Sequence, residues 1–221
     1  MKVRKVIATC LLALCSLGIG VSTNELFISD IQADSTNERL VEQFTQEHSE
    51  TSSKPEPQST SGKPSDSHRK HENMKSEQVS TIAILSAQRL GKLPMVEGVL
   101  DDYDANQRLI DEGVVVRYQS TADIGSDTGN TALIGHRLTH GSVFKHVPDM
   151  EVGERITLTT STGENTYEVI KPAFRIQPDE NWVLSNPLND ESIEDRALLT
   201  LITCGNWLTS HREVVVLEKV S

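Results

Sequence analysis

The sequence predicts a mainly β domain, and two observations support this fold class. Eight short runs rich in β-branched and apolar residues recur over residues 79–221, separated by Gly, Pro, Asn and Asp. One stretch of that region, between Asp101 and Glu112, has the apolar spacing of a helix. Many short strands with few helices are typical of a closed barrel or a sandwich, and they argue against alternating β–α units.

The predicted strands follow one another along the whole domain. They cover Thr81 to Leu85, Leu93 to Val96, Val114 to Tyr118, Thr131 to Ile134, Arg155 to Thr159, Thr166 to Ile176, Leu198 to Thr203 and Glu213 to Val220. These runs combine β-branched and apolar residues with turn residues at their ends, a composition that favours strands.

Three connecting segments carry their own signals. The helix between Asp101 and Glu112 can be capped by Asp101 or Asp102, and the side chains expected to face inward are Tyr103, Leu109 and Ile110. A helical turn is predicted from Ser142 to His146. Residues 177–196 are long for a barrel connection and contain two prolines, which predicts a functional loop.

Residues 1–23 predict a signal anchor. A basic start precedes an uninterrupted apolar run from Val6 to Val21, and no clear small-x-small cleavage site follows it. The run of about 16 residues is shorter than a full membrane-spanning helix of roughly 20. We expect an uncleaved single-pass anchor in the cell membrane, with everything after Ser22 extracytoplasmic. Cys10 and Cys15 are expected to be membrane-buried thiols, with lipidation as the alternative.

Residues 24–78 predict a disordered spacer, and residues 79–221 a single domain. After Phe44 the spacer has few apolar residues and is dense in Ser, Thr, Glu, Gln, Lys and Pro, so it cannot bury enough surface to offset its ordering entropy. A short helical turn is expected from Asn37 to Phe44. From Glu77 onward 12 basic residues stand against 22 acidic ones, and the whole chain carries a net charge of −11. This balance argues against nucleic-acid binding and favours catalysis or peptide recognition.

Cys204 ends one predicted strand, and Arg212 begins the next. A short loop joins them, so the thiol and the guanidinium are expected near facing strand ends. A permanent positive charge beside a thiol favours a thiolate or holds an oxyanion. Cys204 is also the one cysteine of the exported part, so it has no partner for an internal disulfide. The alternative is a small buried apolar residue.

A thiol nucleophile needs a proton partner, and histidine titrates near neutral pH. The domain contains His136, His140, His146 and His211, whereas His48, His68 and His71 fall in the spacer and are expected to be solvated. His136 follows a predicted strand through Gly135, a position that holds the ring on a scaffold and presents it to a cleft. A structural histidine is the alternative at this position.

Three stretches resemble the signatures of one family. Residues 132–137 (Ala-Leu-Ile-Gly-His-Arg), and residues 200–204 (Thr-Leu-Ile-Thr-Cys) followed by Arg212, are similar to the two signatures of sortases, the cell-surface cysteine transpeptidases of Gram-positive bacteria. Leu-Pro-Met-Val-Glu-Gly at 93–98, the anchor and the spacer extend the resemblance over most of the chain. The stretch from His136 to Phe144 looks most like class E. Residues 119–123 lack a common Pro-Gly turn, and Gly205-Asn206 replaces a common proline, which leaves the preferred sorting motif open.

The resemblance implies a closed eight-stranded barrel and assigns roles by position. Cys204 would be the nucleophile, His136 the general acid and base, and Arg212 the residue that holds the oxyanion and the substrate. Leu201 and Thr203, together with Val183 and Leu184 of the long loop, would contact substrate. No cofactor or metal is expected.

The resemblance also implies a reaction and partners. A surface protein with an LPxTG-like or LAxTG-like motif would be cleaved between Thr and Gly through a thioacyl intermediate, and then transferred to the amine of a lipid-linked cell-wall precursor. A pilin-polymerising enzyme, which would use a lysine acceptor, is the nearest alternative.

Four other interpretations remain. A cysteine hydrolase is one, although the papain-like order of Cys before His is reversed here and the caspase-like Gln-Ala-Cys context is missing. A metal site of His136, His140 and His146 is another, although the nearby glycines argue against the helix it would need. Calcium could bind the acidic residues of the long loop, which a solvated loop explains as well. These residues are Asp179, Glu180, Asp190, Glu191, Glu194 and Asp195. A surface-anchored binding module without catalysis is the last.

Overall fold

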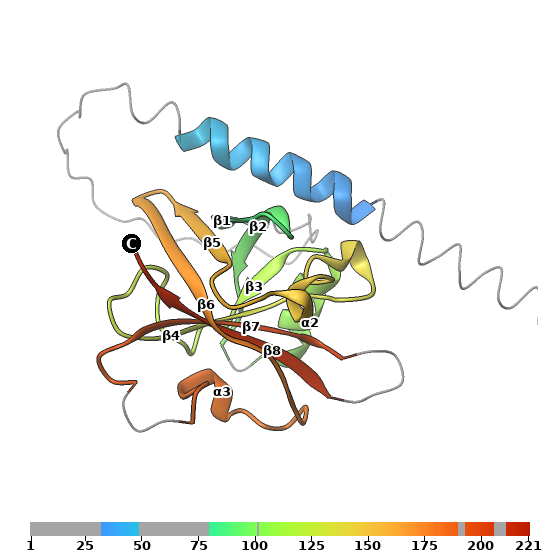
Figure 1. The fold of residues 1–221 in the computed structure, drawn as a ribbon. Helices are drawn as coiled ribbons and strands as arrows, with labels where there is room; N and C mark the ends of the chain where they lie inside the picture. Colours follow the sequence, from blue (N-terminus) through green and yellow to red (C-terminus); the bar gives the residue numbers. More distant parts are fainter. Residues whose placement is uncertain (1–31, 49–79, 101, 190–192, 206–210) are drawn as a thin grey trace, which may run out of the picture.

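The computed structural model describes residues 32–48, 80–100, 102–189, 193–205 and 211–221. Eight strands close into a barrel in the order β1-β2-β3-β4-β7-β8-β6-β5 (Figure 1). The strands are β1 Thr81–Ala87, β2 Gly91–Glu97, β3 Val115–Arg117, β4 Gly129–Ile134, β5 Arg155–Thr160, β6 Gly163–Ile176, β7 Ala197–Cys204 and β8 Arg212–Lys219. The mainly β fold and all eight predicted strands are therefore confirmed.

Two of the eight strand pairs are parallel and place the site. β2 pairs with β3, and β4 pairs with β7, in parallel, while the other six pairs are antiparallel. Parallel neighbours require a crossover, which β5, β6 and the long loop supply between β4 and β7. β4 and β7 consequently end at the same edge of the barrel.

The interior of the barrel is filled by alternate side chains of its strands. Leu85, Leu133, Leu199 and Leu201 are each fully buried there, together with Phe144 from the segment after β4. Successive residues of a strand point to opposite faces, so the residues between these leucines face outward. Two smaller apolar clusters cover the outside of the barrel, one under the long loop and one under α2.

Helix α2, Tyr103–Asp111, confirms the helix predicted between β2 and β3. The side chain of Asp102 accepts a hydrogen bond from the backbone N–H of Ala105 and caps the first turn, as expected. Ile110 is buried, but Tyr103 is 74% exposed, so the prediction that Tyr103 faces inward is wrong. Tyr103 lies in the first turn, where its side chain borders a groove instead of the core.

The connections after β4 and β6 differ in detail from the predictions. Two 3-10 turns, His140–Ser142 and Val147–Asp149, flank the segment predicted as a helical turn. The long loop contains a short helix, α3 (Trp182–Ser185), that the sequence did not predict. Asn130 of β4 holds it there, because its side-chain amide donates to the carbonyls of Val183 and Leu184, at 3.0 Å each.

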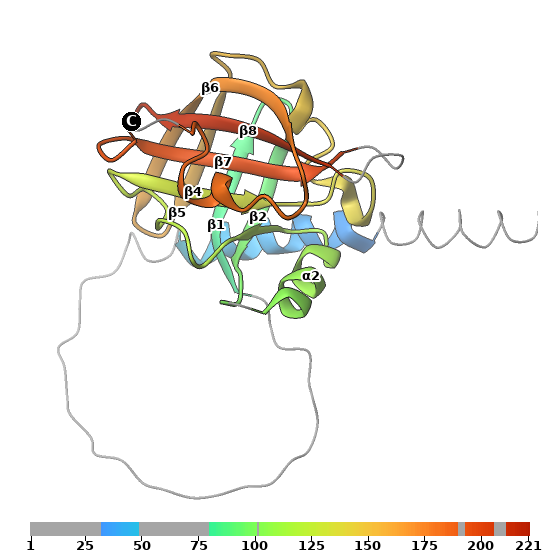
Figure 2. The same ribbon diagram turned by 90° about the horizontal axis from the view of Figure 1, so that it is seen from below.

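A helix over residues 32–48, called the N-terminal helix below, corrects part of the predicted spacer. Ala33, Asn37, Leu40 and Phe44 recur at helical spacing and are buried. The helix lies along one side of the barrel, opposite α3 (Figures 1 and 2). Leu40 packs into the cluster under α2. The short helical turn expected from Asn37 to Phe44 is part of this helix. The prediction of a disordered spacer is wrong for the rest of residues 32–48, because the apolar residues form one stripe that packs on the barrel.

The remaining N-terminal predictions lie outside the described residues. These are the anchor over 1–23 with Cys10 and Cys15, the spacer over 24–31 and 49–78, and with it His68 and His71. His48 is described and is not fully solvated, since its ring stacks on Phe44 at 4.2 Å between centroids. Within the described residues, no helix has the length and apolarity needed to cross a membrane.

Candidate active site

Cys204 and Arg212 are held by the pairing of β7 with β8. The two residues are direct partners in the antiparallel ladder, and Nη1 of Arg212 lies 3.2 Å from Sγ of Cys204. The thiol is exposed, so Cys204 does not serve as apolar packing. The predicted juxtaposition of thiol and guanidinium at facing strand ends is confirmed. The guanidinium has five N–H donors, so donors remain for a second acceptor beside the sulfur.

His136 lies at the corresponding end of β4. Ile134 is the register partner of Ile202 in the parallel pair, and Cys204 and His136 each follow these residues by two positions. Neighbouring strands are about 4.8 Å apart, so this register brings the two residues to adjacent strand ends. Two hydrogen bonds continue the pairing beyond the strand: Gly135 N–H donates to Ile202 O at 3.3 Å, and the Thr203 hydroxyl donates to Gly135 O at 2.8 Å.

Gly135 is required by the packing of the segment that follows His136. A Cβ at position 135 would lie 2.8 Å from Val143 and 3.1 Å from Phe144, both of which join the core. The backbone N–H of Phe144 donates to His136 O at 2.8 Å, which closes this segment over the barrel end. The absence of a side chain at 135 thus allows His136 to sit directly at the rim.

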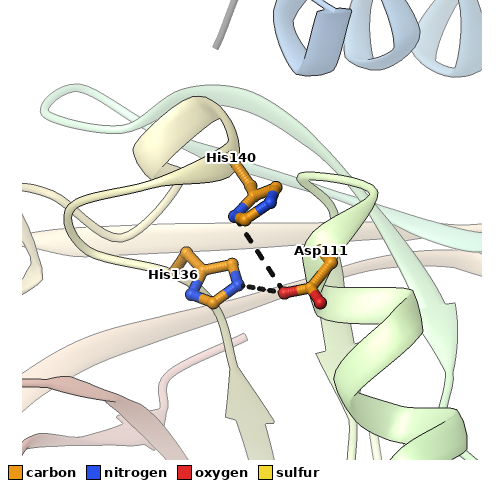
Figure 3. Close-up of side chains that lie close together, drawn as sticks. All are labelled: Asp111, His136 and His140. Carbon is orange, nitrogen blue, oxygen red and sulfur yellow. Dashed lines mark hydrogen bonds and ion pairs between the residues drawn. The ribbon is translucent and has the colours of Figure 1, made fainter. Parts of the chain in front are cut away.

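Asp111 orients the imidazole of His136, a contact that the sequence did not reveal. Nε2 of His136 lies 2.7 Å from Oδ1 of Asp111, and the ring of His140 stacks on His136 with centroids 5.0 Å apart (Figure 3). The position of Asp111 in its helix was one sequence signal for this contact. Asp111 is the last residue of α2, where the helix dipole disfavours a carboxylate, so its presence there points to another partner.

The Asp111 and His136 pair changes the protonation behaviour of both groups. Burial lowers the pKa of His136, whose side chain is 16% exposed, and the hydrogen bond to Asp111 offsets part of that effect. Burial raises the pKa of Asp111, but hydrogen bonds from His136 and Gln107 outweigh it and hold that pKa below its usual value. Asp111 is consequently a carboxylate at neutral pH and accepts from His136.

A groove of about 470 Å³ runs from α2 past Tyr118 to the long loop and reaches Arg212. Val183 and Leu184 line it, as predicted for substrate contacts. Leu201 and Thr203 do not: Leu201 is 0% exposed in the barrel interior, and Thr203 is 1% exposed and bonded to Gly135. The prediction is wrong at these two positions because of strand alternation, and Ile202 between them lines the groove instead.

Two other histidines of the domain and one carboxylate of the long loop have other partners. His146 pairs with Asp149 at 3.1 Å rather than joining His136 and His140, and His211 contacts Glu213 at 3.0 Å. Of the acidic residues proposed for calcium, Asp190 and Glu191 lie outside the described residues. Glu180 turns back on its own loop, where its carboxylate accepts from the backbone N–H of Gln177.

A thiol, a guanidinium and an imidazole at adjoining strand ends of a closed barrel define a thiol-based enzyme site on a β-barrel. The family model of the sortase domain matches residues 85–220, and the chain belongs to the sortase family. Sortase SrtE1 of Streptomyces coelicolor is 28% identical over 136 residues, which are 58% of this chain and 36% of that protein. The chain thus spans about a third of the length of that curated relative.

Solved structures agree with this assignment. The crystal structure of sortase E1 from Streptomyces coelicolor, with a tripeptide in its active site, has a TM-score of 0.56 and 26% identity and covers 64% of this chain and 88% of that one. The class E resemblance is therefore supported. Sortase D5 of Clostridium perfringens has a TM-score of 0.54 at 21% identity, over 85% of this chain and 98% of that one, and it supports the fold.

Proposed function

We propose that this chain is a membrane-anchored, extracytoplasmic cysteine transpeptidase. It cleaves an LPxTG-like or LAxTG-like sorting motif between Thr and Gly and transfers the surface protein to the amine of a lipid-linked cell-wall precursor. The observation that carries the proposal is the 3.2 Å contact between Cys204 Sγ and Nη1 of Arg212, a residue that lines the groove. Family membership and the orientation of His136 on the adjacent strand end support it.

The groove favours an extended peptide with an apolar end. Val183, Leu184 and Ile202 offer apolar side chains along it, Tyr118 and Arg212 offer polar atoms, and Arg212 also contacts Cys204. Ligand sites commonly combine apolar walls with a few placed polar groups that fix orientation. The tripeptide in the related sortase E1 supports a peptide substrate here. The leucine and the proline or alanine of the motif would rest on the apolar wall, with threonine nearest the thiol.

The first half of the reaction forms a thioester. The Cys204 thiolate attacks the threonine carbonyl carbon, and Arg212 donates charged hydrogen bonds to the oxygen that becomes negative. The C–N bond then breaks, and protonated His136 gives its proton to the departing glycine amine. Because Nε2 of His136 is engaged by Asp111, Nδ1 is the nitrogen left for this transfer. The thioacyl enzyme and neutral His136 remain.

The second half resolves the thioester. An incoming amine attacks the thioester carbonyl, and His136 accepts a proton from it through the same nitrogen. Arg212 again holds the oxyanion, and the Cys204 thiolate leaves as the new amide bond forms. The protonated His136 and the thiolate are thereby restored. No metal or cofactor takes part in this sequence of steps.

The test is product analysis with the full chain in detergent micelles. LPxTG and LAxTG peptides are incubated with and without triglycine, and the products are identified by mass spectrometry. Transfer of the peptide up to threonine onto triglycine is the expected result. Release of the free acid alone under every acceptor would contradict transpeptidation, and a lysine-bearing acceptor used in preference would indicate the pilin-polymerising alternative. Protease accessibility of the domain on intact cells tests the topology.

A further inference from the structure

Asp111, His136 and His140 place three metal-ligating atoms around one point. The three atoms lie within 4.8 Å of one another, and they come from α2, the end of β4 and the first 3-10 turn (Figure 3). His136 Nε2 is 2.7 Å and His140 Nδ1 is 4.0 Å from the same oxygen, Oδ1 of Asp111. A tetrahedral zinc ion with bonds near 2.1 Å holds its ligand atoms about 3.4 Å apart. To bind it, the distance from His136 Nε2 to Asp111 Oδ1 must lengthen and the distance from His140 Nδ1 to the same oxygen must shorten, each by under about 1 Å.

His140 Nδ1 is a buried polar atom without a hydrogen-bond partner among the described residues. Leaving such an atom unsatisfied is unfavourable, so it calls for an explanation. The backbone around it is also unusual, since His140 has φ +50° and Ser142 φ +47°, with Gly141 at φ +76° between them. Left-handed conformations of non-glycine residues cluster at functional sites. The fold therefore holds His140 over His136 against local preference.

We propose that Asp111, His136 and His140 bind one divalent transition-metal ion of the zinc type, and that the bound ion reversibly stops the enzyme. Two imidazole nitrogens and one carboxylate oxygen, with a fourth position open to water, are a ligand set suited to zinc. Calcium and magnesium prefer sites built from oxygen atoms, so they do not compete here. The expectation from the sequence was no metal, and the metal site considered there used His146 in place of Asp111.

The inhibitory effect follows from the chemistry of an imidazole ring and rests on the proposed function. A metal-bound imidazole carries at most one proton, on the other nitrogen, so it cannot become the doubly protonated imidazolium. His136 needs that form to protonate the departing amine. The ion also displaces the hydrogen bond between His136 and Asp111, because Nε2 and Oδ1 become its ligands. Zinc binding and catalysis are consequently mutually exclusive states of one side chain.

Binding is measured first, and separately from activity. Zinc is titrated into the full chain in detergent micelles against a chromophoric chelator of known zinc affinity. Asp111→Asn, which keeps the shape, and His140→Phe, which keeps the stacked ring, should each weaken zinc binding roughly tenfold or more. His146→Phe is the matched control, because His146 also contacts a carboxylate but lies outside the cluster. Cys204→Ala should bind zinc like the wild type.

Two results would overturn the site. One is an unchanged zinc affinity in both Asp111→Asn and His140→Phe, and the other is loss of zinc binding in Cys204→Ala, which would move the ion to the thiol. Histidine-ring resonances of the wild type give a readout that needs no variant: His136 and His140 should shift with zinc and His146 should not. A shift confined to other histidines contradicts the proposal.

Inhibition is then measured as the ratio of transpeptidation with and without zinc, and a chelator should restore the rate. Zinc that binds at the cluster without lowering the rate refutes the inhibitory role while leaving the site intact. A chain that binds zinc at the cluster but transfers no peptide in its absence would instead count against the proposed function. Calcium at the same concentration should have no effect on the rate.

Discussion

The two halves of the active site are held by different kinds of structure. Cys204 and Arg212 are partners in the β7 and β8 ladder, so backbone register fixes their distance. His136 lies beyond the end of β4 and is oriented by side chains, Asp111 from α2 and His140 from a strained turn. A ladder is local and cooperative, whereas the second arrangement depends on several elements that must dock correctly. The position of the imidazole is therefore the more easily perturbed.

The N-terminal helix belongs to the side-chain half. Ala33 of this helix packs closely against Gly113 and Gly141. A Cβ added at Gly113 would lie 2.4 Å from the Cβ of Ala33, and one added at Gly141 would lie 2.8 Å from it. Gly113 follows α2 by two residues, and Gly141 follows His140, so one helix face contacts both elements that orient His136. By contrast, none of its described contacts reaches β7 or β8. The N-terminal helix thus supports the elements that orient His136.

The largest effect is expected in the ladder half, from Cys204→Ala. Removing the nucleophile should lower kcat/KM by roughly a thousandfold or more and abolish the thioacyl adduct in intact mass spectra. The thermal midpoint should not change, because the side chain is exposed. An adduct that persists in the alanine variant would rule out Cys204 as the nucleophile.

Arg212→Lys tests whether geometry or charge matters at the oxyanion. Lysine keeps the charge but loses the planar fork, and we expect kcat to fall roughly a hundredfold. Arg175→Lys is the control, because Arg175 lies on the neighbouring strand with a 68% exposed side chain bonded to Glu213. Steady-state peptide cleavage measures both variants. Equal activity of Arg212→Lys and the wild type would mean that a point charge suffices.

Asp111→Asn tests the side-chain half. A hydrogen bond to a charged group contributes about 1.5–3 kcal/mol, so its loss should lower kcat about tenfold to a hundredfold. KM should change little, since Asp111 orients the imidazole and does not line the groove. Asp104→Asn on the same helix is the control. A defect in KM alone would show that Asp111 acts on the groove and not on His136.

Gly141→Ala tests the contact with the N-terminal helix. The added Cβ would meet Ala33 at 2.8 Å, and Gly141 has φ +76°, whereas Gly153 has φ +91° and open space around a Cβ. Gly153→Ala therefore measures the backbone strain alone, and Gly141→Ala should destabilise by about 1–3 kcal/mol more. Ala33→Gly should recover most of that difference in a double-mutant cycle by urea unfolding. Additive effects of the two substitutions would mean that the helix does not press on this turn.

The same division explains what the sequence could predict. The contact between Cys204 and Arg212 could be predicted from the sequence. Leu198 to Cys204 and Arg212 to Leu217 are continuous β-type runs, and pairing of the two strands brings Cys204 to Arg212. The role of Asp111 could not be predicted in this way. Asp111 precedes His136 by 25 residues, and their contact depends on how α2 packs against the barrel. Leu201 faces the core and its neighbour Ile202 faces the groove. A shift of one residue would reverse the two faces, and the composition of a strand does not tell which face is which. Only a short turn from Asn37 to Phe44 was expected within the N-terminal helix, because a sparse apolar stripe gives a weak helical signal until its partner surface is known.

The smallest effect is expected at the end of the ladder farthest from the site. Nε and Nη2 of Arg196 each lie 2.7 Å from the carboxylate of Glu218, and this hydrogen-bonded pair lowers the pKa of Glu218. Because the pKa of Glu218 is lower in the folded than in the unfolded state, the ion pair stabilises the fold at a pH above the unfolded-state pKa of about 4.3. This stabilisation is lost as the pH falls through the folded-state pKa. The side chains are 28% and 33% exposed, so Glu218→Gln should cost about 0.5–1 kcal/mol at pH 7 in urea unfolding. The difference from the wild type should shrink as the pH falls below the unfolded-state pKa. The value of kcat should not change, because the β7 and β8 register sets the position of Cys204. A loss of the same size at pH 7 and at acidic pH would assign the effect to packing rather than to the ion pair.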